Sequence, residues 1–325
     1  MTWTSPFARP GRWLKGNLHT HTTQSDGQKS PQEAIAWYRD HHYDFLAITD
    51  HWVHTPGSGD GLRAGFILLS GAELHGPGYH MLCLGLSALP PRELDGDPAA
   101  LARAVRELGG LPYFAHPYWM GQSSADIAPV KEVAGIEVFN SVCEQMVGLG
   151  YSRVQWDELL GQGRRLTGLA VDDVHWKHGA QGRGFVMVRT DDASEAGILR
   201  ALAEGSFYSS TGPAILDLSL ATMEDGQPAL KVRCSPCETI VFHARGSRGR
   251  RIVPEEGRAL DAVSRGLMPA GDAGARPGTG AARPGLVMLW PLGRRRSATV
   301  MTSPSAIAMA RSRMFSSSRT LPGKG

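Results

Sequence analysis

Short apolar runs alternate with amphipathic stretches between residues 14 and 208 of this 325-residue chain. Such alternation is typical of β/α units around a parallel sheet or barrel. The predicted strands are residues 14–19, 45–49, 66–70, 81–86, 111–115, 135–139, 166–171 and 185–189. The predicted helices are residues 31–41, 98–108, 124–133, 151–160 and 195–204. At the first helix, Ser30, Pro31 and Glu33 form the signature of a capped start.

Beyond residue 208 the pattern changes. Apolar runs at 215–221, 230–234 and 239–243 are separated by Gly, Pro and Asp, which predicts a small antiparallel β appendage. From residue 258 onward Gly, Pro, Ala, Ser and Arg dominate without hydrophobic periodicity, as in low-complexity, disordered chains. We therefore predict three parts: an α/β body of residues 1–212, the appendage of 213–257 and a disordered basic tail of 258–325.

The net charge of +3 conceals an asymmetry. Residues 1–244 hold 19 Lys and Arg against 27 Asp and Glu, whereas residues 245–325 hold 15 against 4. Two interpretations of the basic tail stay open: a segment that binds nucleic acid, or a segment without an evolved fold, such as one translated from a shifted reading frame. We favour the second and do not expect a nucleic-acid partner.

Histidine and acidic side chains follow the predicted strands, at the point where most of those strands end. Because the carboxyl ends of parallel strands converge on one face, we expect these side chains to be neighbours. His80 is the exception, since it opens its strand instead of closing it. The candidate metal ligands are His19, His21, Asp26, His51, Glu73, His80, His116, Asp173 and His175.

Mixed imidazole and carboxylate ligands suit Zn²⁺, Mn²⁺ or Fe²⁺ rather than Ca²⁺. Two such ions bridged by Glu73 would lower the pKa of a shared water molecule and supply hydroxide as a nucleophile at neutral pH. The ions would also screen the charge of a phosphoryl group and stabilise the departing oxygen. The sequence contains no Gly-x-Ser-x-Gly motif for a serine nucleophile.

Read in order, these motifs resemble those of the PHP (polymerase and histidinol phosphatase) superfamily over residues 14–212. The matching motifs are His19-x-His21 with Ser25-Asp26-Gly27, Ile48-Thr49-Asp50-His51, Gly71-Ala72-Glu73, His80 before Leu84-Gly85-Leu86, Ala115-His116-Pro117 and Asp173-x-His175. Within that superfamily, residues 37–41, 135–140 and 210–213 are similar to the branch that includes a carbaryl-hydrolysing metalloenzyme.

The resemblance implies a distorted seven-stranded β/α barrel with two or three divalent ions, in which residues 185–189 are peripheral. It implies one ion held by His19, His21, Glu73 and Asp173, a second by Glu73, His80 and His116, and a third by Asp26, His51 and His175. We expect Glu73, Asp173 and His116 to be needed for catalysis. Some members have His where this chain has Asp26, so Asp26 decides between two ions and three.

Cations and aromatic residues near the ligands are candidates for binding the substrate. Lys177, His178 and Arg183 lie in a Gly-rich loop and would hold a phosphate, unless that loop is simply solvated. Aromatic rings follow several ligands and would form the walls of a pocket. These rings are Trp52, His54, Tyr118 and Trp119. Asp50 and Asp172 neighbour ligands and would orient histidines.

The sequence thus predicts a metal-dependent phosphoesterase acting on a small phosphomonoester or nucleotide through a metal-bridging hydroxide. One alternative keeps the metals and hydrolyses a carbamate or carboxyl ester. Another is a degenerate barrel that binds metal without catalysis. No stretch is apolar enough to span a membrane, and residues 1–16 lack the apolar core of a signal peptide, so we expect a cytoplasmic protein. The sequence does not determine the oligomeric state.

Overall fold

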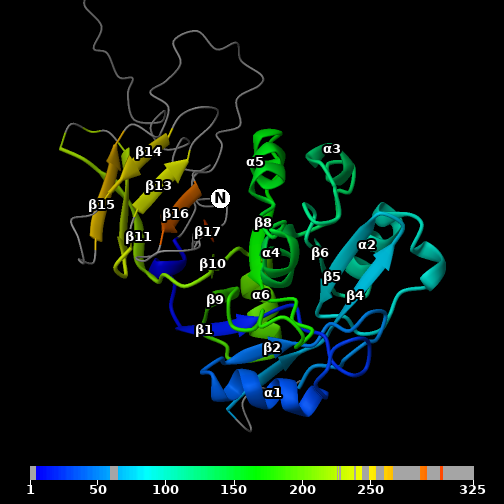
Figure 1. The fold of residues 1–325 in the computed structure, drawn as a ribbon. Coiled ribbons are helices and arrows are strands. Elements are labelled where there is room, and N and C mark those ends of the chain that lie inside the picture. Colours follow the sequence, from blue (N-terminus) through cyan, green and yellow to red (C-terminus); the bar gives the residue numbers. More distant parts are fainter. Residues whose placement is uncertain are drawn as a thin grey trace, which may run out of the picture.

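The fold is given by a computed structural model that describes residues 5–58, 65–224, 226, 228–237, 239–243, 249–253, 260–265, 286–290 and 301–302. All eight predicted strands are present, and their ends differ from the prediction by a few residues. They belong to two mixed sheets, which β4 and β10 extend (Figure 1). The first sheet has the order β17 (Met301–Thr302), β10 (Phe207–Ser210), β9 (Phe185–Thr190), β1 (Arg12–Asn17), β2 (Phe45–Ala47) and β3 (Ile67–Leu69). The second has the order β4 (Gly71–Gly76), β5 (Tyr79–Leu84), β6 (Leu111–Phe114), β7 (Gly135–Asn140) and β8 (Thr167–Val171).

The direction of β5 explains why His80 opens its strand. β5 runs antiparallel to both β4 and β6, whereas β6, β7 and β8 are parallel. The amino end of β5 therefore lies at the same edge of the sheet as the carboxyl ends of β6, β7 and β8. His80, near that amino end, meets the ligands that follow the parallel strands.

The closed seven-stranded barrel is not found among the described strands. Both edges of β1 are occupied, by β2 on one side and by antiparallel β9 on the other, so β8 has no ladder to β1. The predicted strand at 185–189 is therefore not peripheral. The described strands of the two sheets share no ladder, and isolated bridges connect residues beside them: Thr20 with Val174, His51 with Glu73 and Thr55 with Gly71.

The two sheets share an apolar core between them, and helices cover their outer faces. Leu14 and Phe45 from one sheet and Leu84, Tyr113 and Leu169 from the other are fully buried in this core. Outside it, α2 packs on β6, α5 on β7 and α1 on β2. The helices are η1 (Pro6–Ala8), α1 (Pro31–Asp40), η2 (Arg92–Leu94), α2 (Pro98–Glu107), α3 (Ser124–Ile127), α4 (Ser141–Val147), α5 (Arg153–Gly161) and α6 (Glu195–Ala203).

The predicted capping box at α1 is confirmed, and the predicted helix at 124–133 is too long. The Ser30 hydroxyl accepts a hydrogen bond from the Glu33 amide (3.3 Å), and the Glu33 carboxylate accepts one from the Ser30 amide (2.8 Å). α3 ends at Ile127, and Pro129, two residues later, has no amide hydrogen with which to continue the helical ladder.

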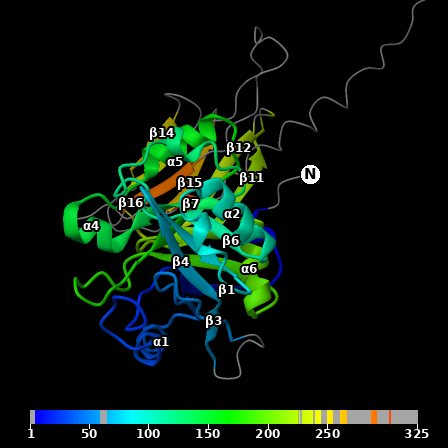
Figure 2. The same ribbon diagram turned by 90° about the vertical axis from the view of Figure 1, so that its right-hand side faces the viewer.

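Antiparallel strands follow β10, as the change of pattern predicted. They lie at one end of the molecule, with α1 and β3 toward the other (Figure 1, Figure 2). Three of the strands lie within residues 258–325, which we predicted to be disordered: β15, β16 and β17. The rest of that tail lies outside the described residues, and the boundaries of the three predicted parts stay a prediction. The two small sheets have the orders β11 (Ile215–Thr222), β12 (Pro228–Cys234), β15 (Leu260–Arg265) and β14 (Gly249–Ile252), β13 (Thr239–His243), β16 (Leu286–Trp290).

Candidate metal centre

All nine predicted ligands gather at one place, between the ends of strands from both sheets. His19 and His21 follow β1, Asp26 lies in the next loop and His51 follows β2. Glu73 lies in β4, His80 in β5, His116 after β6, and Asp173 and His175 after β8. Five of them are buried: His19, His21, Glu73, His116 and Asp173. The other four lie toward solvent.

The Glu73 carboxylate is the centre of this cluster. Its Oε1 lies 2.8 Å from Nδ1 of His80 and 3.2 Å from Nε2 of His116. Its Oε2 lies 3.0 Å from Nδ1 of His51 and 3.3 Å from Nε2 of both His19 and His21. The two oxygens thus face different sets of imidazoles, which is the arrangement of a carboxylate that bridges two cations.

Asp173 completes a donor group with the two histidines that follow β1. Its Oδ1 lies 3.0 Å from Nε2 of His21 and 3.3 Å from Nε2 of His19. The two Nε2 atoms are 3.1 Å apart. Two nitrogens that bind one Zn²⁺ at about 2.0–2.1 Å are separated by roughly 3 Å, so this spacing suits a shared cation.

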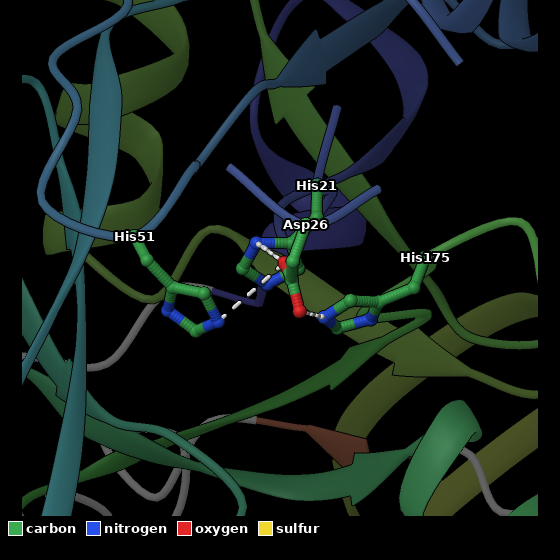
Figure 3. Close-up of side chains that lie close together, drawn as sticks. All are labelled: His21, Asp26, His51 and His175. Atoms are coloured by element: carbon green, nitrogen blue, oxygen red, sulfur yellow. Dashed lines mark ion pairs between the residues drawn. The ribbon is translucent and has the colours of Figure 1, made fainter. Parts of the chain in front are cut away.

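A second donor group surrounds Asp26 at the outer side of the cluster. Figure 3 shows its carboxylate between three imidazole rings. Oδ2 lies 3.2 Å from Nε2 of His175, and Oδ1 lies 3.7 Å from Nε2 of His51 and 3.8 Å from Nδ1 of His21. The four donor atoms lie within 4.8 Å of one another. A third such group consists of His51, Glu73 and His80.

Several buried polar atoms of the cluster face one another at short distance without the alignment of a hydrogen bond. Oε2 of Glu73, Oδ1 of Asp173 and Nδ1 of His51 are among them. A buried carboxylate oxygen without an aligned hydrogen bond is costly, whereas a divalent cation satisfies several such atoms at once. Imidazole and carboxylate donors suit Zn²⁺, Mn²⁺ and Fe²⁺, so the residues present fit the metal ions that the sequence predicted.

The electrostatics of the buried ligands also favour a cation. Burial works against a charged imidazole at His19, but the neighbouring carboxylates, with Asp173 contributing most, raise the pKa of His19 well above its usual value. The same balance raises the pKa of His21 to about 9. Burial opposes ionisation of Glu73, yet the surrounding imidazoles, His19 foremost, hold its pKa well below the usual range. The carboxylates thus hold positive charge here, which protons supply when metal ions do not.

The ligands His116 and Asp173 have strained backbones. Their φ angles are 29° and 53°, in a region that residues with a side chain rarely adopt. Such conformations cost on the order of 1–3 kcal/mol and persist where surrounding structure enforces them, commonly at functional sites. Trp52, directly after the ligand His51, is similar at 50°.

Two residues of β7 that hold the ligands in place were missed as site residues. Glu137 accepts from Nδ1 of His19 (2.6 Å) and from the His116 amide (2.8 Å). Asn140 donates to Glu137 (2.9 Å) and to Oδ2 of Asp173 (3.0 Å). Partners of this kind orient metal ligands and fix the imidazole tautomer. The available signal was a glutamate inside a strand that is buried along its whole length.

We expected Asp50 and Asp172 to orient histidines, but neither carboxylate does so directly. Asp50 accepts from the Thr22 amide (2.7 Å) and hydroxyl (2.6 Å) and from the Ser25 hydroxyl. Asp172 accepts from Tyr38 (2.6 Å) and from the backbone amides of residues 182–184. Burial raises the pKa of Asp172 to about 6, against these hydrogen bonds. Asp172 thus anchors the Gly-rich loop after β8.

A cavity of about 280 Å³ opens over the metal centre. Lys177 and His178 line it, as predicted, whereas Arg183 does not; its Nε donates to the Gly179 carbonyl (2.9 Å). Of the four predicted wall aromatics only Trp119 lines the cavity. Trp52, His54 and Tyr118 are not part of its lining: Trp52 Nε1 donates to the His75 carbonyl (3.0 Å), and His54 Nε2 lies 2.9 Å from the Leu86 carbonyl.

No protein-family model and no curated protein matches the sequence. The fold is similar to a two-domain protein from Bacteroides vulgatus that contains a predicted PHP-like metal-dependent phosphoesterase, at 16% identity and a TM-score of 0.49 over 78% of this chain and 86% of that one. It is also similar to a protein from Bifidobacterium adolescentis proposed to be a metal-dependent phosphoesterase, at 15% identity and a TM-score of 0.37 over 50% of this chain and 88% of that one.

The resemblance to the carbaryl-hydrolysing branch stays a prediction. Among the described residues, no helix is both long and apolar enough to span a membrane.

Proposed function

We propose that this protein is a metal-dependent phosphoesterase that hydrolyses a small phosphomonoester or nucleotide. The observation that carries this proposal is the convergence of nine imidazole and carboxylate side chains, with unpartnered Glu73 and Asp173 oxygens, beneath an open cavity. A purely structural histidine cluster has no need of unsatisfied carboxylate oxygens, because its carboxylates would be fully hydrogen-bonded.

The ligand sets that we propose correspond to the three donor groups, except that His116 takes the place of His51 beside Glu73 and His80. His19, His21, Glu73 and Asp173 would hold one ion, Glu73, His80 and His116 a second, and Asp26, His51 and His175 a third. His51 is close to both Glu73 and Asp26, so it joins either the second or the third set. We propose Zn²⁺, Mn²⁺ or Fe²⁺ for these sites, on the basis of the donor types.

When bound, divalent ions supply Lewis-acid chemistry: activation of water as the nucleophile and screening of phosphoryl charge. The chain's own residues prepare the site for it. Glu137 holds the proton of His19 on Nδ1 and leaves Nε2 free to bind metal. Lys177 and His178, at the cavity edge, are placed to contact the outer oxygens of a phosphate.

Replacing a buried ligand tests the proposal. In metal-reconstituted protein, Asp173→Asn and His19→Ala should each lower kcat/KM for p-nitrophenyl phosphate by at least about a hundredfold, since even outer partners of metal ligands contribute 10- to 100-fold. Circular dichroism should show a retained fold. Asp40→Asn, an exposed carboxylate on α1, is the control and should keep full activity. Unchanged turnover in both ligand variants contradicts the proposal.

One observation favours a second candidate, a carbamate or carboxyl ester hydrolase on the same site. Part of the cavity wall is apolar, which suits the uncharged aromatic part of such an ester. Parallel assays of the same metal-loaded protein with p-nitrophenyl phosphate and a 1-naphthyl carbamate separate the two reactions. Hydrolysis of the carbamate alone assigns the second function.

A further inference from the structure

The cavity over the metal centre has two unlike walls. One is formed by Trp119, Val142, Cys143 and Met146, and all four side chains are apolar or nearly so. A second part of the lining, the polar wall, consists of Asp26, His175, Lys177 and His178, which are polar or charged. The candidate ligands Glu73, His80, His116 and Asp173 also line the cavity.

The apolar wall lies beside one end of the metal centre. The Trp119 ring is 5.1 Å from the ring of His116 and 6.2 Å from that of His80, edge-on to both. Trp119 remains 40% exposed and Met146 54%, although both are large apolar side chains. Exposed apolar groups that line a cavity commonly mark a place where an apolar ligand is bound.

Hydrogen bonds fix the elements that carry this wall. After His116, the Met120 and Gln122 amides donate to the carbonyls of His116 (3.2 Å) and Pro117 (2.9 Å) and hold the loop of Trp119 in a tight turn. The next element of the wall is α4, which is capped at its amino end by Asn140. The Asn140 side chain accepts a hydrogen bond from the Cys143 amide (3.1 Å). A wall held in this way is formed before the ligand arrives.

The amino end of α4 is tied both to the candidate metal centre and to the loop that carries part of the polar wall. Asn140 also donates to Asp173, a ligand. The Ser141 hydroxyl donates to the Ala180 carbonyl (2.7 Å), in the loop that carries Lys177 and His178. The spacing between the apolar wall, the metal centre and the polar wall is therefore set by a short chain of direct contacts.

We propose that the substrate is an ester of an apolar, preferably aromatic, alcohol, which lies against Trp119, Val142 and Met146 while its acid group lies over the metal centre toward Lys177. This inference rests on the proposed function and narrows its substrate class. Hydrolysis adds water across the P–O bond and gives inorganic phosphate and the apolar alcohol. A sugar or glycerol group would instead place hydroxyls against Trp119 and Met146, where they lose their water partners.

Kinetics with matched esters test the apolar wall. Metal-reconstituted wild type should hydrolyse 1-naphthyl phosphate with a kcat/KM at least about tenfold above that for glycerol 1-phosphate. Trp119→Ala and Met146→Ala should remove most of this preference, because they should lower kcat/KM for 1-naphthyl phosphate, mainly through KM, much more than kcat/KM for glycerol 1-phosphate. Val147→Ala is the matched control: Val147 is 56% exposed on the same helix but does not line the cavity. Equal kcat/KM values for the two esters in wild type overturn the proposal.

Binding of uncleavable probes separates this inference from the proposed function. Phenylphosphonate should bind metal-loaded wild type at least about tenfold more tightly than methylphosphonate in isothermal titration calorimetry, and Trp119→Ala should bind both alike. If this result is obtained and no phosphate ester is hydrolysed, the inference that the apolar wall binds an apolar group is supported and the phosphoesterase proposal fails. Equal affinities of wild type for the two phosphonates overturn the proposal that the apolar wall binds the substrate's alcohol group, whatever the enzyme hydrolyses.

Discussion

At the scale of single residues, the site depends on how carboxylates are shared among histidines. Glu73 faces five imidazoles through its two oxygens, whereas Asp26 serves three at the solvent side. Loss of the two carboxylates should therefore have different effects. Loss of Glu73 would disturb the whole centre, but loss of Asp26 would disturb only its outer part.

Asp26→Ala should remove one bound ion and leave the others. Asp26 is half exposed and is the acid of the group with His21, His51 and His175, so its loss deprives that group of its negative charge. Metal analysis by mass spectrometry after reconstitution and desalting should show about one ion fewer per chain than wild type. Asp40→Ala should match wild type. An unchanged metal content in Asp26→Ala shows that Asp26 is not a ligand.

The raised pKa values of His19 and His21 make the metal-free protein less stable as the pH rises. The pKa of His21 is about 9 in the folded protein against an ordinary value of 6.5, so the stabilising charge is fully present below pH 6.5 and is lost as the pH rises through 9. A shift of this size corresponds to roughly 3 kcal/mol. Thermal unfolding followed by circular dichroism should show the Tm falling by at least about 5 °C between pH 6.5 and 9.

A matched variant assigns this pH dependence to the cluster. In metal-free Glu73→Gln the carboxylate that helps to raise both pKa values is absent, so the fall in Tm should be much smaller. A Tm that is flat over this pH range in wild type would show that His19 and His21 are neutral in the metal-free site.

At the scale of elements, the junction of β7 and α4 does two jobs through one side chain. The side-chain oxygen of Asn140 caps α4, and its side-chain nitrogen donates to Glu137 and Asp173. α4 ends at Gly148 with a φ of 71°, a left-handed conformation that glycine adopts without strain. The helix is therefore fixed at both ends, and its amino end is tied to a metal ligand.

Two substitutions of Asn140 separate these jobs. Asn140→Ala removes the cap and the amide contacts, so it should lower the free energy of unfolding by about 1 kcal/mol or more and weaken metal binding about 10- to 100-fold. Asn140→Ser keeps a good capping group without the amide, and should recover stability more than metal affinity. Chemical denaturation and competition with a chelator measure the two effects. Equal recovery of both by Ser would contradict two separate roles.

At the scale of the whole molecule, the metal centre joins the two large sheets. Backbone hydrogen bonds connect them beside the site, such as those of His21 with Val174 and of Trp52 with Glu73, and the candidate ligands come from the ends of strands of both. Metal binding should therefore stabilise the whole α/β body and not one loop. Each site occupied at 100 times its Kd adds about 2.7 kcal/mol to the free energy of unfolding.

Removal of metal tests this coupling. Treatment with a chelator should lower the Tm of the reconstituted protein by several degrees, and re-addition of Zn²⁺ or Mn²⁺ should restore it. Asp173→Asn, which lacks a buried ligand, should show a much smaller difference between the metal-loaded and metal-free forms. Identical Tm values in both forms of wild type would mean that the cluster binds no ion that stabilises the fold.

The sequence predicted the eight strands and all nine residues of the cluster, because residue type and apolar periodicity are local signals. It missed β4, which carries Glu73, since Gly71–Gly76 contains too little apolar sequence to be recognised beside β3. Glu137 and Asn140 were missed because their roles depend on His19 and Asp173, residues distant in sequence. Arg183 was placed at the substrate, but its amide donates to Asp172 and its Nε donates to the Gly179 carbonyl.

By itself, the sequence determined the donor set: which residues offer imidazole or carboxylate groups, and that strand ends present them. Only the tertiary structure decided which nitrogen faces which oxygen, that β9 rather than β8 pairs with β1, and that the cavity has one apolar and one polar wall. These features depend on contacts between residues far apart in the chain, such as Asn17 with Asp172 and His19 with Glu137. Packing of the two sheets sets such distances, and no local pattern encodes it.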